Sequence, residues 1–89
     1  MERGFRLRGR VQGVGFRWWT RKTAESLGVV GTVKNLPDGS VEVMARADQE
    51  TMRVFADKLR YGPTTASVER MEDVPVELPD GVDSFRIER

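Results

Sequence analysis

One stretch near the N-terminus carries residue types and spacings suited to binding a small anion, and it reads Gly9-Arg10-Val11-Gln12-Gly13-Val14-Gly15-Phe16-Arg17. Two closely spaced glycines let successive backbone N–H groups turn toward one point. A helix that follows would add its unpaired first-turn donors and the positive end of its dipole. Arg17 would bring a planar, always charged guanidinium, which matches a phosphate better than a lysine ammonium does. The stretch therefore indicates an anion site, with a phosphate as the best fit.

The glycine spacing differs from that of the nucleotide-binding motifs. The third glycine of a dinucleotide motif and the Lys-Ser/Thr pair of a P-loop are both missing, so a single phosphoryl group is favoured over a nucleotide. The residues alone leave other readings open. Gly13 and Gly15 could serve only a tight turn, and Arg17 could be a solvated first-turn residue. A cation there opposes the helix dipole, which leaves room for an anion between them.

The composition excludes several classes of enzyme. The 89 residues include no cysteine and no histidine, which removes Ser-His-Asp and Cys-His mechanisms, Cys/His zinc sites and a disulfide framework. Only carboxylates, amides, hydroxyls and guanidinium groups remain for chemistry. We therefore expect neither a metal nor a cofactor.

Length and hydropathy bound the organisation of the chain. We expect one domain over residues 1–89, because chains divide into domains only at greater lengths. Apolar residues at 38% and charged residues at 33% are typical of a globular protein with one core. No signal-peptide pattern and no run of about 20 apolar residues is present, so we expect a cytoplasmic protein with no membrane partner.

The charges are unevenly distributed, although the formal net charge is only +1. Residues 1–22 hold seven Lys/Arg against Glu2 alone, and residues 69–89 hold seven Asp/Glu against three arginines. A basic N-terminal third favours an anionic ligand, whereas the near-neutral total argues against broad nucleic-acid affinity. The same distribution would also arise if the two segments paired across a sheet.

Hydrophobic periodicity predicts the elements that must position the glycine loop. The expected strands are Phe5–Val11, Val29–Asn35, Ser40–Ala47, Ala66–Val74 and Ser84–Glu88, and the expected helices are Phe16–Leu27 and one that begins after Asp48 and ends at Gly62-Pro63. This order predicts an α+β, ferredoxin-like βαββαβ sandwich, with two helices on one face of a four- to five-stranded antiparallel or mixed sheet. The glycine loop should then leave a central strand close to Asn35.

Three polar or aromatic positions allow more than one interpretation. Asn35 precedes the turn Leu36-Pro37-Asp38-Gly39, where an asparagine commonly serves only the turn. Trp18 and Trp19 are adjacent on the predicted helix and point roughly 100° apart, so both cannot be core residues. We expect Trp19 to be the more buried of the two and Trp18 to lie near the surface.

The loop and a second stretch, Gly31-Thr32-Val33-Lys34-Asn35-Leu36-Pro37-Asp38-Gly39-Ser40-Val41-Glu42-Val43, resemble the two signature motifs of the acylphosphatase family. The similarity continues through Leu59, the Gly62-Pro63 stop and Phe85-x-Ile87, so it covers nearly the whole chain. The resemblance implies a small, metal-free hydrolase. Such an enzyme cleaves the carboxyl–phosphate anhydride of small acyl phosphates, such as acetyl phosphate, to a carboxylate and inorganic phosphate.

The resemblance also implies roles for individual residues. Arg17 matches the family's phosphate-binding arginine, Asn35 matches its water-positioning asparagine, and Gln12, Gly13, Val14, Gly15 and Phe16 match its phosphate loop. Thr32 stands where the family usually has an aromatic residue, and Arg46-Ala47 replaces a common acidic–glycine pair. We expect these departures to leave the chemistry intact while affecting substrate access or local packing.

The implied chemistry needs few protein groups. A carboxylate leaving group has a conjugate acid of pKa roughly 4, so it departs without a proton donor. The remaining tasks are to hold the phosphoryl charge and to position a water molecule. Because no histidine is available as a base, we expect the proton of the water to pass to a phosphate oxygen of the substrate.

Two rival functions would use the same fold. An RNA-binding module needs aromatic side chains on the open sheet face. The outward positions of the first and third strands are instead Arg6, Arg8, Arg10, Glu42, Met44 and Arg46. A regulatory domain that binds phosphate without turnover is the second rival. We expect a monomer that takes no nucleic acid.

Overall fold

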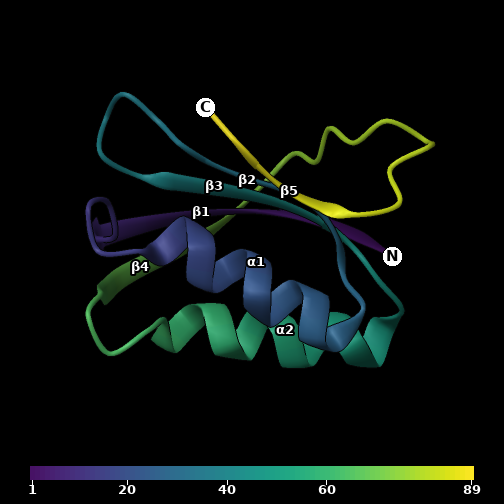
Figure 1. The fold of residues 1–89 in the computed structure, drawn as a ribbon, viewed down its shortest axis with the longest axis horizontal. Helices are drawn as coiled ribbons and strands as arrows, with labels where there is room; N and C mark the ends of the chain where they lie inside the picture. Colours follow the sequence, from purple (N-terminus) through teal and green to yellow (C-terminus); the bar gives the residue numbers. More distant parts are fainter.

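The computed structural model describes residues 1–89. The elements follow one another as β1 (Glu2–Arg10), α1 (Phe16–Leu27), β2 (Val30–Asn35), β3 (Val41–Arg46), α2 (Gln49–Tyr61), β4 (Ser67–Val74) and β5 (Phe85–Glu88). The five strands form one sheet in the order β4-β1-β3-β2-β5. All neighbours are antiparallel except β2 and β5, which are parallel. Both helices pack on the same face of the sheet (Figure 1). The predicted ferredoxin-like α+β fold is confirmed.

The core lies between the helices and alternate residues of the central strands. From β1, Phe5 and Leu7 are fully buried, as the alternation of apolar and charged residues predicts. The apolar stripe of α2 is also buried, with Phe55 touching Phe85 of β5 edge to face at 6.1 Å between ring centroids. Each such side chain stabilises the fold by about 1.5–3 kcal/mol through removal from water.

The helix boundaries follow local signals in the sequence. Asp48 caps α2, because its carboxylate accepts a hydrogen bond from the Thr51 backbone N–H at 2.8 Å. The Thr51 bonds lower the pKa of the Asp48 carboxyl. In α1, Trp19 is partly buried and stacks at a tilt on Phe16, whereas Trp18 is 58% exposed. The expected difference between the two tryptophans is confirmed.

The first strand begins earlier than its apolar pattern predicts. It starts at Glu2 and ends at Arg10, where the periodicity predicts Phe5–Val11. The added residues lack an apolar alternation because Glu2 and Arg3 lie at the surface, but their backbones pair with Arg46 and Ala45 of β3. Backbone pairing therefore extends the strand beyond the segment that the side chains mark.

The segment from Pro75 to Ser84 crosses the sheet face opposite the helices, and Arg46 holds it there. The Arg46 guanidinium donates to the carbonyls of Pro79, Asp80 and Val82 at 3.1, 3.3 and 3.4 Å, and it pairs with Glu2 at 2.6 Å. An acidic residue could make none of these contacts. The departure at this position thus serves the crossover segment, far from the glycine loop.

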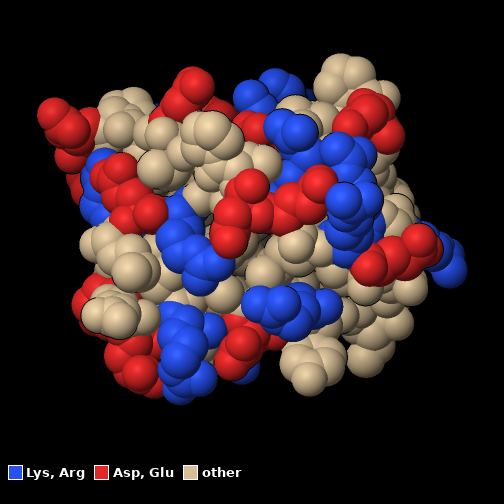
Figure 2. Space-filling view, turned by 180° about the vertical axis from the view of Figure 1, so that it is seen from behind, with Lys and Arg blue, Asp and Glu red and all other residues tan.

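The basic and acidic ends of the chain pair with each other where β1 lies beside β4. Arg8 contacts Glu72 at 2.9 Å on the open face, whereas Arg3, whose guanidinium lies over the ring of the buried Phe5, contacts Asp73 at 2.8 Å on the side of the helices. Figure 2 shows basic and acidic side chains interspersed over the visible surface. The interpretation of the uneven charge as cross-strand pairing is confirmed for these arginines. Neither helix is long and apolar enough to span a bilayer.

Candidate active site

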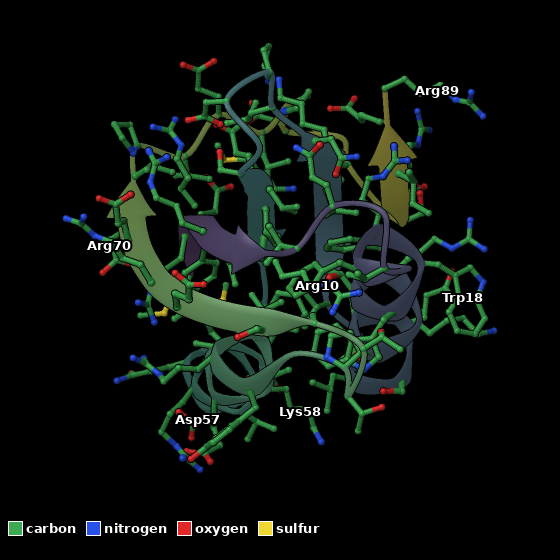
Figure 3. All side chains as sticks on the ribbon, turned by 90° about the vertical axis from the view of Figure 1, so that its left-hand side faces the viewer. Arg10, Trp18, Asp57, Lys58, Arg70 and Arg89 are labelled. Atoms are coloured by element: carbon green, nitrogen blue, oxygen red, sulfur yellow. The ribbon has the colours of Figure 1, made fainter.

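Three connections meet at one end of the molecule: residues 11–15, the β2–β3 turn at 36–40, and the α2–β4 connection at 62–66. They lie at the left of Figure 1, and Figure 3 looks onto them. The glycine loop enters this end from β1 and leads into α1. Asn35 reaches the same end because it ends β2, two residues after the buried Val33 and therefore on the helix-covered side.

The glycine loop presents backbone donors that no protein group uses. Gly13 and Gly15 have φ of 73° and 78°, in the left-handed region that glycine adopts without strain. No backbone N–H from Gln12 to Gly15 donates within the protein, and no side chain caps α1. The first helical bond runs from the Trp19 N–H to the Gly15 carbonyl at 3.0 Å. The loop and first turn thus place free N–H groups at the positive end of a helix dipole.

Arg17 adds a cation with no carboxylate partner. Its Nη1 donates only to the Glu88 carbonyl, at 3.4 Å. The arginines that form ion pairs are Arg3, Arg6, Arg8, Arg21, Arg46, Arg53 and Arg70. The charge of Arg17 is therefore left uncompensated beside the glycine loop.

Arg17, Asn35 and both loop glycines line one cleft of about 350 Å³, whose apolar wall includes Phe16, Trp18 and Ile87. The Oδ1 atom of Asn35 is buried and has no hydrogen-bond partner. A buried acceptor left in this state costs about 1–3 kcal/mol, so native proteins keep few of them. Of the four buried side-chain atoms without a partner, Asn35 Oδ1 is the one whose residue lines this cleft.

Gln12 joins the glycine loop to the turn that follows Asn35. Its Nε2 donates to the carbonyls of Leu36 and Ser40, both at 2.9 Å. Both hydrogens of the side-chain amide are used in these two bonds, so the backbone N–H is the only donor of Gln12 that is free for a ligand. The loop and the hairpin turn are thereby fixed relative to each other.

An ion-pair network on the open sheet face also holds the β2–β3 turn, through Asp38. Asp38 accepts from the Ser40 hydroxyl and backbone N–H, and from Nη1 of Arg8 at 3.0 Å. These bonds, with those from Ser40 largest, lower the pKa of Asp38 from 3.8 to about 2. Arg8 also donates to Glu72 at 2.9 Å and lowers the pKa of that carboxyl. The charge network thus runs from β4 through β1 to the turn.

Thr65 makes a hydrogen bond to the glycine loop that the sequence patterns do not predict. It lies in the α2–β4 connection, and its hydroxyl donates to the Val14 carbonyl in the glycine loop at 2.8 Å. The two residues are 51 positions apart, and an exposed threonine in a short connection carries no sequence signal of such a contact.

The departures from the family pattern, at Thr32 and at Arg46-Ala47, lie outside the cleft. Thr32 faces the crossover segment.

Comparison with known proteins shows the family to which the chain belongs. The model of the acylphosphatase family matches residues 3–87. The chain belongs to the acylphosphatase family. It is 45% identical over 82 residues to an acylphosphatase from Thermococcus kodakarensis, covering 92% of this chain and 89% of that one. It is 48% identical over 82 residues to an acylphosphatase from Treponema denticola, covering 92% of this chain and 86% of that one.

A solved structure agrees with these relatives. The crystal structure of acylphosphatase from Bacillus subtilis superposes with a TM-score of 0.91 at 28% identity, covering 99% of this chain and 98% of that one. The expected family and activity are confirmed. As an acylphosphatase the protein is a hydrolase of acid anhydrides, with an acyl phosphate as substrate and inorganic phosphate as product.

Proposed function

We propose that the loop from Gln12 to Arg17 binds the phosphoryl group of a small acyl phosphate and that Asn35 positions the attacking water. The observation that carries this proposal is the convergence of free loop N–H groups, the unpaired Arg17 and the unpartnered amide oxygen of Asn35 on one cleft. The N–H groups and the guanidinium suit the phosphoryl oxygens, and an amide oxygen suits a water O–H.

These groups match the charge that develops during the reaction. The transition state for phosphoryl transfer is loose, with negative charge spread over the phosphoryl oxygens. Donors fixed in advance by the fold stabilise that charge without reorganising during the reaction. The guanidinium of Arg17 makes two parallel bonds to two oxygens, which also fixes the phosphorus for in-line attack.

Proton transfer in this proposal needs no protein acid or base. The carboxylate leaves as its stable anion, since its conjugate acid has a pKa of roughly 4. Asn35 holds the water, the water oxygen bonds to phosphorus as the P–O bond to the carboxylate breaks, and the proton of the water passes to a phosphoryl oxygen. The products are the carboxylate and inorganic phosphate. Arg17 and the loop amides compensate the substrate charge, so the step requires no metal or cofactor.

The proposal also covers the domain organisation, oligomeric state, location and partners of the enzyme. Residues 1–89 act as one acylphosphatase domain, a monomer in the cytoplasm, with an acetyl phosphate-like substrate and no nucleic-acid or membrane partner. The open sheet face supports this, because Arg6 and Arg8 there are paired with Glu42 and Glu72, and aromatic side chains are absent from its outward positions. An RNA-binding module would need stacking surfaces there.

Hydrolysis of acetyl phosphate by the Arg17→Lys variant tests the phosphate role. We expect kcat/KM to fall by about 100-fold or more, because lysine keeps the charge and loses the planar fork. Arg21→Lys, one turn along the same helix, is the matched control and should keep its activity. Wild-type turnover in the Arg17 variant would remove Arg17 from the site. Phosphate binding without turnover by the wild-type protein would instead support a sensing domain.

The Asn35→Ala variant separates water positioning from phosphate binding. We expect kcat to fall while the inhibition constant of inorganic phosphate stays unchanged, because the water is lost and the phosphate contacts remain. Both constants come from one steady-state inhibition series. If inorganic phosphate binds more weakly in this variant, Asn35 belongs to the phosphate contacts.

A further inference from the structure

The Val14–Gly15 peptide is the one peptide of the glycine loop whose carbonyl is held by a side chain. Thr65 donates to the Val14 carbonyl at 2.8 Å from the α2–β4 connection, which packs beside the loop at the same end of the molecule. Thr64, the preceding residue, is also exposed, and its hydroxyl makes no hydrogen bond within the protein. The contact is therefore specific to one of two adjacent threonines.

The direction of this carbonyl decides the direction of an amide in the cleft. The chain has no cis peptide bond, and in a trans peptide the C=O and N–H point to opposite sides. The N–H of the same peptide unit belongs to Gly15, which lines the cleft and whose N–H donates to no protein group. With the carbonyl turned to Thr65, this N–H is turned away from Thr65.

Without a restraint this peptide could turn over. A peptide flip changes ψ of the preceding residue and φ of the following one. Here the following residue is Gly15, which accepts φ of either sign. A flip would turn the Val14 carbonyl toward the side that now carries the Gly15 N–H. A carbonyl dipole facing a phosphoryl oxygen repels it, so the flipped loop would bind a phosphoryl group less well.

We propose that Thr65 is a positioning residue for the phosphate loop, whose hydroxyl holds the Val14–Gly15 peptide with the Gly15 N–H directed at the phosphoryl group. The inference rests on the proposed function, because it assumes that the phosphoryl group lies in this loop. It adds a residue from outside both family motifs. Thr65 acts through the peptide and does not touch the substrate.

The test uses three variants of the full chain: Thr65→Val removes the hydroxyl at nearly constant shape, Thr65→Ser keeps it, and Thr64→Val is the matched control. Loss of one hydrogen bond corresponds to about a two- to tenfold change. We expect Thr65→Val to raise the inhibition constant of inorganic phosphate, and the KM of acetyl phosphate, by this factor. Thr65→Ser and Thr64→Val should match the wild-type protein.

A second measurement distinguishes positioning from a general effect on stability. In ¹H–¹⁵N spectra, added inorganic phosphate should shift the Gly15 amide proton downfield in the wild-type protein, and less so in Thr65→Val at equal saturation. A purely structural threonine would lower the midpoint of urea unfolding without altering this shift. Equal phosphate affinity in Thr65→Val and Thr64→Val would overturn the inference, as would equal losses in Thr65→Val and Thr65→Ser.

The wild-type spectrum separates this inference from the proposed function. If phosphate shifts the amides of the loop in the wild-type protein and Thr65→Val behaves like Thr64→Val, only the role of Thr65 is wrong. If phosphate leaves all loop amides of the wild-type protein unchanged, the proposed phosphate site is wrong and the role of Thr65 falls with it.

Discussion

Replacing Gln12 by methionine should disrupt the link between the phosphate loop and the turn that follows Asn35. Methionine has a similar length and no N–H donor, so the change removes both 2.9 Å bonds, to the carbonyls of Leu36 and Ser40. At about 1 kcal/mol for each net bond, the free energy of unfolding should fall by about 2 kcal/mol. A domain with a typical stability of about 5–15 kcal/mol remains folded after such a loss.

The expected effect on catalysis is larger than the effect on stability. In the proposed site the loop donates to the phosphoryl group and the turn follows Asn35, which positions the water. A misplacement of about 1 Å between reacting groups can cost on the order of 100-fold in rate. We therefore expect kcat for acetyl phosphate to fall by about 10- to 100-fold in Gln12→Met. The inhibition constant of inorganic phosphate should change little, since the backbone donors of the loop stay in place.

Steady-state kinetics and urea unfolding of the same preparations give both quantities. Gln49→Met is the matched control, because Gln49 is exposed at the start of α2 and makes no side-chain hydrogen bond. Gln12→Glu should lower both kcat and the free energy of unfolding more than Gln12→Met does, because its carboxylate would face two carbonyl oxygens. If Gln12→Met keeps wild-type kcat while losing the expected stability, the link contributes to folding and not to catalysis.

Two further predictions concern pH. The pKa of Asp38 is about 2 in the folded protein and 3.8 ordinarily, so its contribution to stability is complete above pH 4 and is lost as the pH falls toward 2. The difference in urea midpoint between wild type and Asp38→Asn should therefore shrink over that range, and a constant difference would contradict the assignment. Because the chain has no histidine, kcat should show no protein titration near pH 6.5. An inflection in kcat that keeps its pH with different acyl phosphates would indicate a protein base.

The sequence predicts most of the fold because its helices and strands bury single apolar stripes. The α1 boundaries, Phe16–Leu27, are those that the spacing predicts. The β2–β3 hairpin agrees to within one residue at each strand end, because strand ends there coincide with turn residues. The strand β1 agrees less well, since its first residues pair through backbone groups, and backbone pairing carries no side-chain pattern.

The site is predictable only where residue type and local spacing determine its chemistry. Glycines before a helix and an arginine in its first turn are local signals, so the sequence alone predicts an anion site there, and the structure places both loop glycines and Arg17 along one cleft. The contacts of Gln12, Arg8 and Thr65 depend on which segments the fold brings together. Their partners lie 24, 30 and 51 residues away, so no short window of sequence contains both members of any pair.

The positions of the charges explain why Arg17 has no carboxylate partner. On β1 the outward residues Arg6 and Arg8 face Glu42 and Glu72 on the two neighbouring strands, so the sheet itself supplies their partners. Arg17 is on a helix, and the nearest acceptor it reaches is a backbone carbonyl of β5. Neighbouring strands thus supply carboxylates to Arg6 and Arg8, whereas no carboxylate reaches Arg17 at the start of the helix. A chain with a net charge of only +1 can thus present an unpaired guanidinium beside the positive end of a helix dipole, and in the proposed site both act on the same phosphoryl group.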